Sequence, residues 1–495
     1  MTVSLRRNAW LPVLAGLAYL ALLLWRFRTV PDGLVNDTAE ESLRGLLLLE
    51  QHRLEVLTLV LGNSAETLWL YVVGVSSAVL GPTVLAVVLP SALAAAATAA
   101  LVTGLVRVLD PEVPWGVPFL LAVGSPWLFH YGRSGLRTIA APLFLALTAL
   151  LLARAARDPG RRWPFALAGA SAAASVYAYT SCRLVPVALG LALATECFRD
   201  RERRRDWLHA SGFALAGLAV VSLPNLFYLT THPREFLTRG GYVVVGPAGE
   251  RVRNLVATIA LPFDYPHRYR FIWGEAHVFD GVSAGLTGSG LDPVPLAVGL
   301  LFAVGLVWRL IRRRDVTTLF LAFLLALAIA VLGPAGPSLT RLLVVVPVYV
   351  VFASFGVGAL SRRPWIRKAF LAGLSLLAAA TLVRYFTRLS DPARESREYN
   401  AASQTAMGER ARAASRDGPV LCVVTESANV VRYLAHGTPV TVVEFYQRPF
   451  DPRAAEPDSG VRTVFVETQQ RLEGWTPPGF VEVERGPLFR VLLRS

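Results

Sequence analysis

Eleven apolar runs, each close to the length of a membrane-spanning helix, constrain this chain more than any other feature. A helix needs about 20 mostly apolar residues to cross the hydrocarbon core of a bilayer. The runs lie near residues 9–28, 83–107, 116–131, 138–156, 163–181, 183–198, 207–229, 293–309, 315–332, 342–361 and 369–386. With 54% hydrophobic and 17% charged residues, the composition also excludes an ordinary soluble protein. We predict a mainly α-helical, polytopic membrane protein with about 11 transmembrane helices.

The basic residues, almost all of them arginine, gather between these runs. Clusters lie at residues 154–162, 199–205, 309–314 and 362–368, on the same side of the predicted bundle as Arg6 and Arg7. Cytoplasmic loops of membrane proteins carry an excess of Lys and Arg. We therefore place the N-terminus in the cytoplasm and attribute the net charge of +14 to topology rather than to a nucleic-acid partner.

The preference for arginine over lysine is typical of a GC-rich bacterial genome, which predicts a multi-pass protein of the bacterial inner membrane. No small-residue cleavage site follows the first apolar run. We expect that run to be an uncleaved transmembrane helix rather than a signal peptide. Cys182, Cys197 and Cys422 have neither metal-ligand spacing nor a disulfide pattern, so we interpret them as structural.

Three segments are expected on the external face: a first loop at residues 30–82, a second at 230–292 and a short one at 333–341. Residues 66–80 of the first loop resemble a further span. Counting them as one would put the arginine clusters on opposite faces, and the segment is short. We predict a helix lying in the outer interface, with Trp69 and Tyr71 as its interfacial aromatic residues.

Hydrophobicity falls after residue 386, where a transmembrane domain of residues 1–386 is expected to give way to an external, periplasmic domain of residues 387–495. Strands are predicted at 420–425, 439–445 and 462–468, with a helix at 427–436 and closing strands near 480–484 and 488–494. This pattern indicates a small α/β domain. The first strand is followed by TESAN (425–429), which lacks the glycines of a phosphate-binding loop, so a nucleotide site is not expected.

Asp37 ends the segment PDGLVND (31–37) and stands just before an amphipathic helix near the outer membrane surface. Asp37 or Thr38 could cap that helix, with Glu40 and Glu41 complementing its dipole. Asp37 could equally act as a general base at the boundary between water and lipid. The residues alone fit both interpretations.

Isolated arginines recur at the predicted outer boundary of the membrane, although Lys and Arg are usually enriched on the cytoplasmic side. Arg133 and Arg137 lie in SPWLFHYGRSGLRTIAAP (125–142), Arg183 in YAYTSCRLVP (177–186) and Arg341 in PSLTRLLVVVP (337–347). A single such arginine could simply extend to the lipid headgroups. Four of them on different helices favour a single site that binds an anion. A guanidinium group can donate two parallel hydrogen bonds to the oxygens of a phosphate.

These segments together resemble the polytopic GT-C glycosyltransferases, among them protein O-mannosyltransferases and aminoarabinose transferases. PDGLVND resembles their proline-containing turn before an Asp-Glu pair, although Thr38 stands in place of the second acid. AETLWLYVVGVSSAVLGPT (65–83) is similar to their Glu-Pro-Leu-aromatic segment, with Thr67 in place of the proline. RSGLRTIAAP (133–142) and AYTSCRLVP (178–186) resemble their Ser-Arg and Tyr-Thr-x-x-Arg-x-x-Pro signatures. The similarity extends over roughly residues 8–390.

The resemblance implies an inverting glycosyltransferase with a polyprenyl-phosphate sugar as donor and a glycan, lipid or protein as acceptor. Asp37 would be the catalytic base. The second acid would be Glu40, Glu41 or Glu66, while Arg133, Arg137, Tyr179, Arg183 and Arg341 would hold the donor phosphate or substrate. No cofactor or metal is expected, since Asp264 and Asp280 are lone acids beside histidines.

Two other functions remain open alongside this enzyme. A transporter of lipid or polysaccharide would place ionisable residues at mid-membrane and often shows related halves, neither of which the sequence displays. A catalytically inactive relative serving as a subunit is favoured by Thr38 and Thr67, where the family has an acid and a proline.

Overall fold

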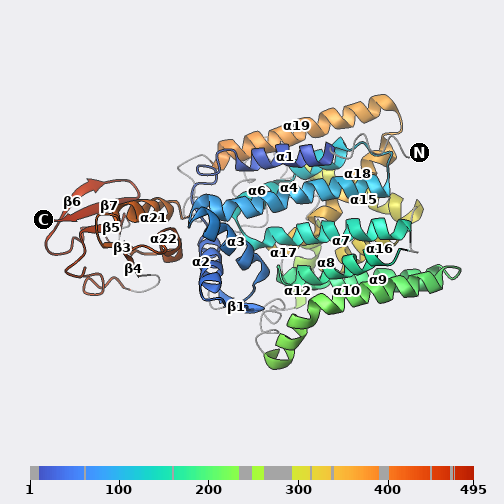
Figure 1. Cartoon of the computed structure of the whole chain (residues 1–495). Helices are drawn as coiled ribbons and strands as arrows, with labels where there is room; N and C mark the ends of the chain where they lie inside the picture. Colours follow the sequence, from blue (N-terminus) through green and yellow to red (C-terminus); the bar gives the residue numbers. More distant parts are fainter. Residues whose placement is uncertain are drawn as a thin grey trace.

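The computed structural model describes residues 11–60, 63–158, 161–233, 248–260, 293–312, 315–335, 339–389, 401–445, 449–468, 472 and 474–495. Figure 1 shows a bundle of long helices that run in roughly the same direction, with a small α/β domain at one end. The fold class predicted from the sequence is confirmed.

Each of the apolar runs coincides with one helix or a pair of helices. These are α1 (Leu11–Leu24), α4 (Val84–Leu109), α5 (Gly116–Val123) with α6 (Pro126–Ser134), α7 (Ala140–Arg157), α8 (Trp163–Val176), α9 (Leu184–Arg199), α10 (Arg204–Thr231), α15 (Pro293–Arg312), α16 (Val316–Leu332), α18 (Val346–Leu360) and α19 (Pro364–Leu389). Among the described residues, six helical segments are long and apolar enough to cross a membrane, and four shorter apolar helices are present: α1, α8, α16 and the helix at Leu68–Leu80. The total of eleven spans stays a prediction.

The run at 116–131 differs from the prediction because it is divided between α5 and α6. Pro126 lacks a backbone N–H and cannot continue the hydrogen bonding of α5. Instead it occupies the first turn of α6, where the N–H is not needed, and the Ser125 hydroxyl accepts a hydrogen bond from the Leu128 N–H at 3.4 Å. The apolar run is therefore interrupted where a new helix, α6, begins with its own N-terminal cap.

Three helices begin with a tighter turn at the end of the bundle next to the α/β domain. These turns are η1 (Arg137–Ile139) before α7, η2 (Thr180–Arg183) before α9 and η4 (Leu343–Val345) before α18. Arg341 lies in α17 (Leu339–Leu342), directly before η4, and α17 contacts η2 while η1 contacts η4. The tight turns thus bring Arg137, Arg183 and the arginine of α17 to the same end of the bundle.

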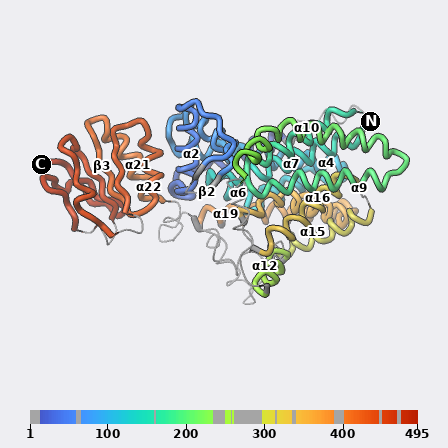
Figure 2. Tube along the Cα trace, turned by 90° about the horizontal axis from the view of Figure 1, so that it is seen from below, coloured from blue at the N-terminus to red at the C-terminus, as the bar shows by residue number. Residues whose placement is uncertain are grey.

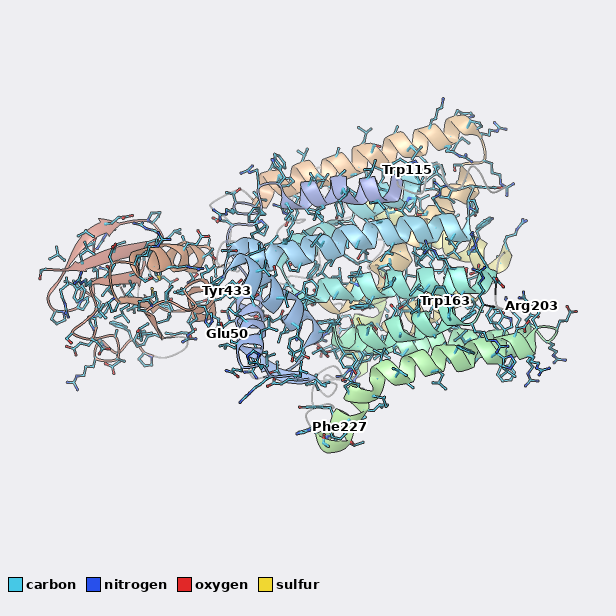
Figure 3. All side chains as sticks on the ribbon, in the orientation of Figure 1. Glu50, Trp115, Trp163, Arg203, Phe227 and Tyr433 are labelled. Carbon is cyan, nitrogen blue, oxygen red and sulfur yellow. The ribbon has the colours of Figure 1, made fainter. Side chains whose placement is uncertain are left out.

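The arginine-rich clusters lie at the opposite end. In Figure 3, Arg203 and Trp163 lie toward one end of the bundle, and Glu50 and Tyr433 lie at the other end beside the α/β domain. Helices α7 and α9 begin at η1 and η2 and end at Arg157 and Arg199. This separation agrees with the predicted topology, and the assignment of the arginine-rich end to the cytoplasm stays a prediction.

The first loop folds into a compact layer between the bundle and the α/β domain (Figure 2). It contains α2 (Asn36–Glu50), the antiparallel hairpin of β1 (Leu57–Val60) and β2 (Asn63–Glu66), and α3 (Leu68–Leu80). Of the predicted second loop, only residues 230–233 and α12 (Ala248–Ala260) are described, and the remainder, with Asp264 and Asp280, lies outside the described residues. Asn254 of α12 donates a hydrogen bond to the Pro334 carbonyl at 3.2 Å.

Helices α2 and α3 approach each other closely at two glycines. A Cβ atom on Gly45 would lie 2.0 Å from the Leu70 carbonyl oxygen, and one on Gly74 would lie 2.6 Å from the Gly45 carbonyl oxygen. Both distances fall far inside van der Waals contact, and both obstacles are backbone atoms. The position of α2 against the bundle therefore depends on these two residues.

Replacing Gly45 by alanine is expected to lower the free energy of unfolding by about 1–3 kcal/mol, because the added methyl group must push α2 away from α3. Gly212, inside α10, provides a matched control, since its Cβ would meet nothing within 4 Å. Gly212→Ala should leave thermal stability unchanged or slightly raised. Thermal unfolding of both variants in detergent measures the difference, and equal melting temperatures would contradict the close packing.

The α/β domain is built on a five-stranded sheet with the strand order β4-β3-β5-β7-β6. Its strands are β3 (Val420–Val424), β4 (Val440–Glu444), β5 (Thr463–Glu467), β6 (Phe480–Arg485) and β7 (Phe489–Arg494). Strands β4, β3 and β5 are parallel, and β7 and β6 continue the sheet in antiparallel pairs. Helices α21 (Ala402–Ala414) and α22 (Ala428–Leu434) contact each other and the parallel strands. The sequence predicted the strands and α22 but not α21.

Glu467 at the end of β5 joins α21 to this sheet. Its carboxylate accepts hydrogen bonds from the Thr425 N–H at 2.8 Å and the Thr425 hydroxyl at 2.7 Å, and from the Gln404 side-chain amide. Burial raises the pKa of the Glu467 carboxyl, while the hydrogen bonds from Thr425 act in the opposite direction. Glu467 is therefore a structural acid of this domain.

The α/β domain contacts the first loop and α4 through both apolar and polar contacts. Tyr433 belongs to a buried cluster that includes Val84 and Val88 of α4. Its hydroxyl lies 2.8 Å from the Ser77 hydroxyl, and burial raises the pKa of Tyr433 to about 12, so the group stays neutral. The Leu34 N–H donates to the Thr405 hydroxyl at 3.0 Å. These contacts hold the domain directly over α2.

Candidate functional site

Asp37 lies in the first turn of α2, at the end of the helix bundle that faces the α/β domain, and it is exposed. The expected capping role is wrong: α2 begins at Asn36, and its capping residue is Val35, which makes no side-chain capping bond. The Thr38 hydroxyl is directed elsewhere and donates to the Ser134 carbonyl at 3.3 Å. Since Asp37 is inside the first turn, its charge still complements the helix dipole.

A cluster of buried charges lies one turn further along α2. Arg137 Nε is 3.0 Å from Glu41 Oε1, and Arg137 Nη1 is 3.9 Å from Glu66 Oε2. On the other side of Glu66, Arg183 Nη2 is 3.8 Å from Oε1, and the Thr180 hydroxyl donates to Oε1 at 2.6 Å. The five residues come from α2, β2, η1 and η2, so the cluster joins the first loop to the openings of α7 and α9.

Burial divides this cluster into an inner and an outer part. The side chains of Glu41, Glu66 and Arg137 are at most 6% exposed, whereas that of Arg183 is 26% exposed. Arg137 also lies with its guanidinium carbon 5.7 Å from the centre of the Tyr179 ring, a distance typical of a cation–π contact. The inner residues hold each other, and Arg183 is the cation that can reach a ligand.

Asp37 is the exposed acid of the same assembly. It precedes Glu41 by four residues, so both project from one face of α2. The arrangement consequently offers a solvent-accessible carboxylate next to a buried, charge-balanced cluster that holds a half-buried guanidinium group.

The sequence-predicted residues separate into two groups. Asp37, Glu41, Glu66, Arg137, Tyr179 and Arg183 are brought together as described, and Arg341 is partly buried in α17, which contacts the η2 turn that carries Arg183. Glu40 and Arg133 lie elsewhere. Glu40 accepts a hydrogen bond from the Asn429 side chain of the α/β domain at 3.1 Å.

Arg133 donates its hydrogen bonds to backbone carbonyls at the end of α1. Its Nε donates to the Val30 carbonyl at 3.0 Å and its Nη1 to the Leu22 carbonyl at 3.2 Å, with a further bond to the Leu23 carbonyl. The last carbonyls of a helix lack partners inside the helix, and Arg133 supplies them here. Its guanidinium carbon also lies 5.0 Å from the centre of the Phe386 ring.

Arg133→Gln is expected to lower the free energy of unfolding by about 1.5–3 kcal/mol, because hydrogen bonds from a charged donor to the α1 carbonyls are lost. Binding of a phosphate-containing ligand by the folded fraction should not change. Arg363→Gln is a suitable control, since Arg363 is an exposed arginine at the far end of the bundle. Thermal unfolding and ligand titration measure the two quantities, and weaker ligand binding at unchanged stability would place Arg133 in the binding site instead.

Thr180 is the residue of this site that the sequence did not single out. Its hydroxyl bonds to Glu66, which is distant in sequence, so no local pattern predicts the contact. The available signal was the Tyr-Thr-x-x-Arg segment, in which Tyr179, Thr180 and Arg183 are now all found at the cluster. Among the described residues, no group of three or more His, Cys, Asp or Glu side chains lies close enough to hold a metal ion.

Several solved structures of other proteins resemble this architecture. The structure of ArnT from Cupriavidus metallidurans bound to undecaprenyl phosphate matches with a TM-score of 0.63 at 11% identity, covering 98% of both chains. Its apo state matches with a TM-score of 0.61 at 13% identity, again over 98% of both chains. The oligosaccharyltransferase of Archaeoglobus fulgidus matches with a TM-score of 0.50 at 12% identity, over 92% of this chain and 67% of the other.

The chain has the GT-C glycosyltransferase fold. The resemblance seen in the motifs is confirmed, and the profile of the family described as dolichyl-phosphate-mannose-protein mannosyltransferase matches residues 67–228. No curated protein sequence matches. The matched region begins after Glu66 and includes Arg137, Tyr179 and Arg183, while Asp37 and Arg341 lie outside it. The low identity to the solved structures shows the fold alone.

Proposed function

We propose that this protein is an inverting glycosyltransferase that moves a sugar from a polyprenyl-phosphate donor to an acceptor on the face that carries the α/β domain. The observation that supports this most is the exposed Asp37 carboxylate one helical turn from the buried cluster of Glu41, Arg137, Glu66 and Arg183. The GT-C fold and the family described by a lipid-linked mannose donor support the reaction class. On this proposal, that face is external.

Asp37 is assigned as the general base. It would take the proton from the acceptor hydroxyl while the acceptor oxygen forms a bond to the anomeric carbon. The bond from that carbon to the phosphate oxygen breaks at the same time, and polyprenyl phosphate leaves. Attack opposite to the leaving group inverts the configuration of the anomeric carbon. Exposure of Asp37 supports this role, because an acceptor must reach it from outside the bundle.

Arg183 and Arg341 are assigned to the donor phosphate. Charge grows on the phosphate as the sugar leaves, and positively charged donors fixed in place stabilise that charge without rearrangement. The partial exposure of Arg183 supports this role. Arg137 is assigned as a positioning residue, since it holds Glu66, which in turn holds Arg183. Glu41 and Glu66 balance these cations rather than act as a second base.

Polyprenyl phosphate should therefore bind the purified protein, and Arg183→Gln should weaken that binding roughly tenfold, as expected when one charge-assisted contact to phosphate is lost. Arg203→Gln is the matched control, because Arg203 is an exposed arginine at the opposite end of the bundle. Native mass spectrometry with undecaprenyl phosphate in detergent measures the affinities. Equal losses in the two variants, or no binding by the wild type, would contradict the assignment of the donor.

A further inference from the structure

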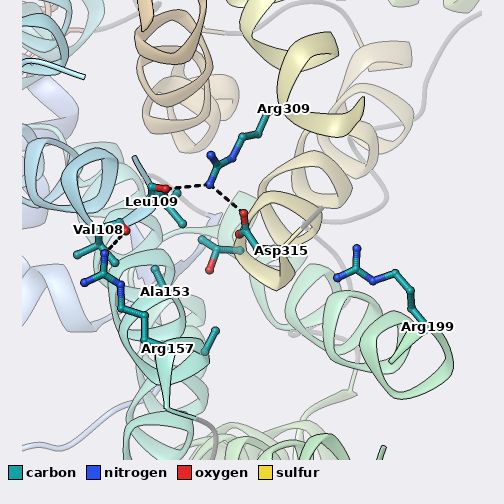
Figure 4. Close-up of a pocket in the computed structure, with 9 residues that line it drawn as sticks. Val108, Leu109, Ala153, Arg157, Arg199, Arg309 and Asp315 are labelled. Carbon is teal, nitrogen blue, oxygen red and sulfur yellow. Dashed lines mark hydrogen bonds and ion pairs between the residues drawn. The ribbon is translucent and has the colours of Figure 1, made fainter. Parts of the chain in front are cut away.

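A pocket lined by three arginines lies at the arginine-rich end of the bundle, far from Asp37. Its volume is about 430 Å³, and it lies between α4, α7, α9, α15 and α16. Figure 4 shows Arg157, Arg199 and Arg309 around it, with Val108, Leu109 and Ala153 on the apolar side. Because α7 and α9 begin at the candidate active site and end at this pocket, the two sites are separated by the length of these helices.

The acids near the pocket are already engaged. Arg309 Nη2 is 2.9 Å from Asp315 Oδ2 and donates to the Leu109 carbonyl at 3.2 Å, and Arg309 Nη1 is 4.0 Å from Asp110. Asp315 also caps α16 by accepting a hydrogen bond from the Thr318 N–H at 2.9 Å. Arg309 itself is 2% exposed. Arg309, Asp110 and Asp315 therefore form a structural salt-bridge network at the back of the pocket.

Two other arginines remain at the pocket's opening. Arg199 is 2.6 Å from Glu196 on its own helix, and its side chain is 41% exposed. Arg157 is exposed and donates to the Val108 carbonyl, and no described carboxylate lies within ion-pair distance of it. The lining itself carries three arginines and a single acid, Asp315. Glu196 and Asp110 do not line it, so its surface favours an anion.

Thr317 provides an independent sign of a ligand. It lines the pocket, its side chain is fully buried, and its hydroxyl has no hydrogen-bond partner among the described residues. A buried hydroxyl without a partner costs free energy, so most such groups in proteins are satisfied. Thr317 also lies in the first turn of α16, a helix of 17 residues, where N–H groups and the helix dipole favour a negative charge.

We infer that this pocket binds the phosphate headgroup of an anionic phospholipid from the membrane leaflet at the arginine-rich end. Trp163 and Arg203 lie at this end (Figure 3), as expected at the level of the headgroups. Basic pockets between transmembrane helices are suited to such lipids. Arg157 and Arg199 hold the phosphate oxygens, Thr317 donates a hydrogen bond, and the apolar side contacts the start of an acyl chain.

Native mass spectrometry of the full chain in detergent tests the site with phosphatidylglycerol, phosphatidylcholine and inorganic phosphate as separate probes. We expect phosphatidylglycerol to bind at least roughly tenfold more tightly than phosphatidylcholine, and Arg157→Gln to remove most of that preference. Thr317→Val, which keeps the shape of the side chain, should weaken binding by roughly threefold, within the usual value of one hydrogen bond. Arg203→Gln, at the same end but outside the pocket, should have no effect.

Equal binding of the two lipids, or equal losses in Arg157→Gln and Arg203→Gln, would overturn the proposal. Binding of inorganic phosphate with the same dependence on Arg157, in the absence of lipid binding, would overturn the lipid assignment and leave a soluble phosphate as the ligand. Thermal unfolding checks that each variant is folded, and Arg157→Lys, which keeps the charge, should retain part of the preference if a variant without charge is unstable. Arg183→Gln should not change this binding, which separates the pocket from the donor site.

Discussion

Asp37→Asn is expected to lower the rate of sugar transfer by about 10²–10⁴-fold, the range that general-base catalysis contributes. Asparagine has nearly the same shape but cannot take the acceptor proton at neutral pH. Because Asp37 is exposed and does not cap α2, stability should change little, by about 0.3–1 kcal/mol for the lost favourable interaction with the helix dipole. The affinity for polyprenyl phosphate should stay unchanged, since the arginines hold the phosphate.

Initial rates of transfer and lipid-binding affinities of the same preparations measure these effects. Glu40→Gln is the matched control, because Glu40 is on the same helix but bonds to Asn429 of the α/β domain. Its rate should stay within a few-fold of the wild type, a change of about 1 kcal/mol in the barrier. Near-normal transfer by Asp37→Asn would show that Asp37 is not the general base.

Arg137→Met is expected to lower the free energy of unfolding by about 3–5 kcal/mol, because it leaves the buried carboxylates of Glu41 and Glu66 without this cation. Arg137→Lys should recover only part of the loss, since a single ammonium group cannot reproduce the planar guanidinium that contacts both acids. Transfer activity should fall as well, because Glu66 also holds Arg183.

Chemical or thermal unfolding in detergent measures this effect, and a triple variant provides the control. Replacing Arg137 by Met together with Glu41→Gln and Glu66→Gln removes the buried charges along with their partner. Stability should then return toward the wild-type value, as observed in general when a buried ion pair is replaced by uncharged groups. Equal instability of the single and triple variants would show that packing, rather than charge, explains the loss.

Much of the fold follows from the sequence because a bilayer leaves few choices. Backbone groups in hydrocarbon must be satisfied inside the segment, so a long apolar run becomes a helix. The division of residues 116–131 into α5 and α6 was missed because the run is apolar throughout, and only Pro126 after Ser125 marks the break. Helix α21 was missed because twelve of its 13 residues are alanine, glycine or polar, so it has no apolar periodicity, and its partner α22 lies further along the chain.

The site could be predicted only in part. The sequence predicted Asp37 at the start of an amphipathic helix that carries Glu41, and the recurrence of arginine at one boundary suggested Arg137 and Arg183. Two features depend on how distant segments meet: the ion pairs of Glu66, and the hydrogen bonds of Arg133 to the end of α1 rather than to the cluster. No local sequence pattern contains that information. The pocket at the opposite end was not foreseen either, since its arginines come from three helices that are distant in sequence.

Release of free polyprenyl phosphate from labelled polyprenyl-phosphate sugars, measured with the purified chain in nanodiscs, tests the central claim most directly. Our account predicts release that requires an acceptor, that is at least about 100-fold slower in Asp37→Asn, and that is coupled to appearance of the sugar on the acceptor with inverted configuration. Tight binding of the donors with no release from any of them, in wild type and Asp37→Asn alike, would contradict it and leave a relative that binds lipid-linked sugars without transferring them.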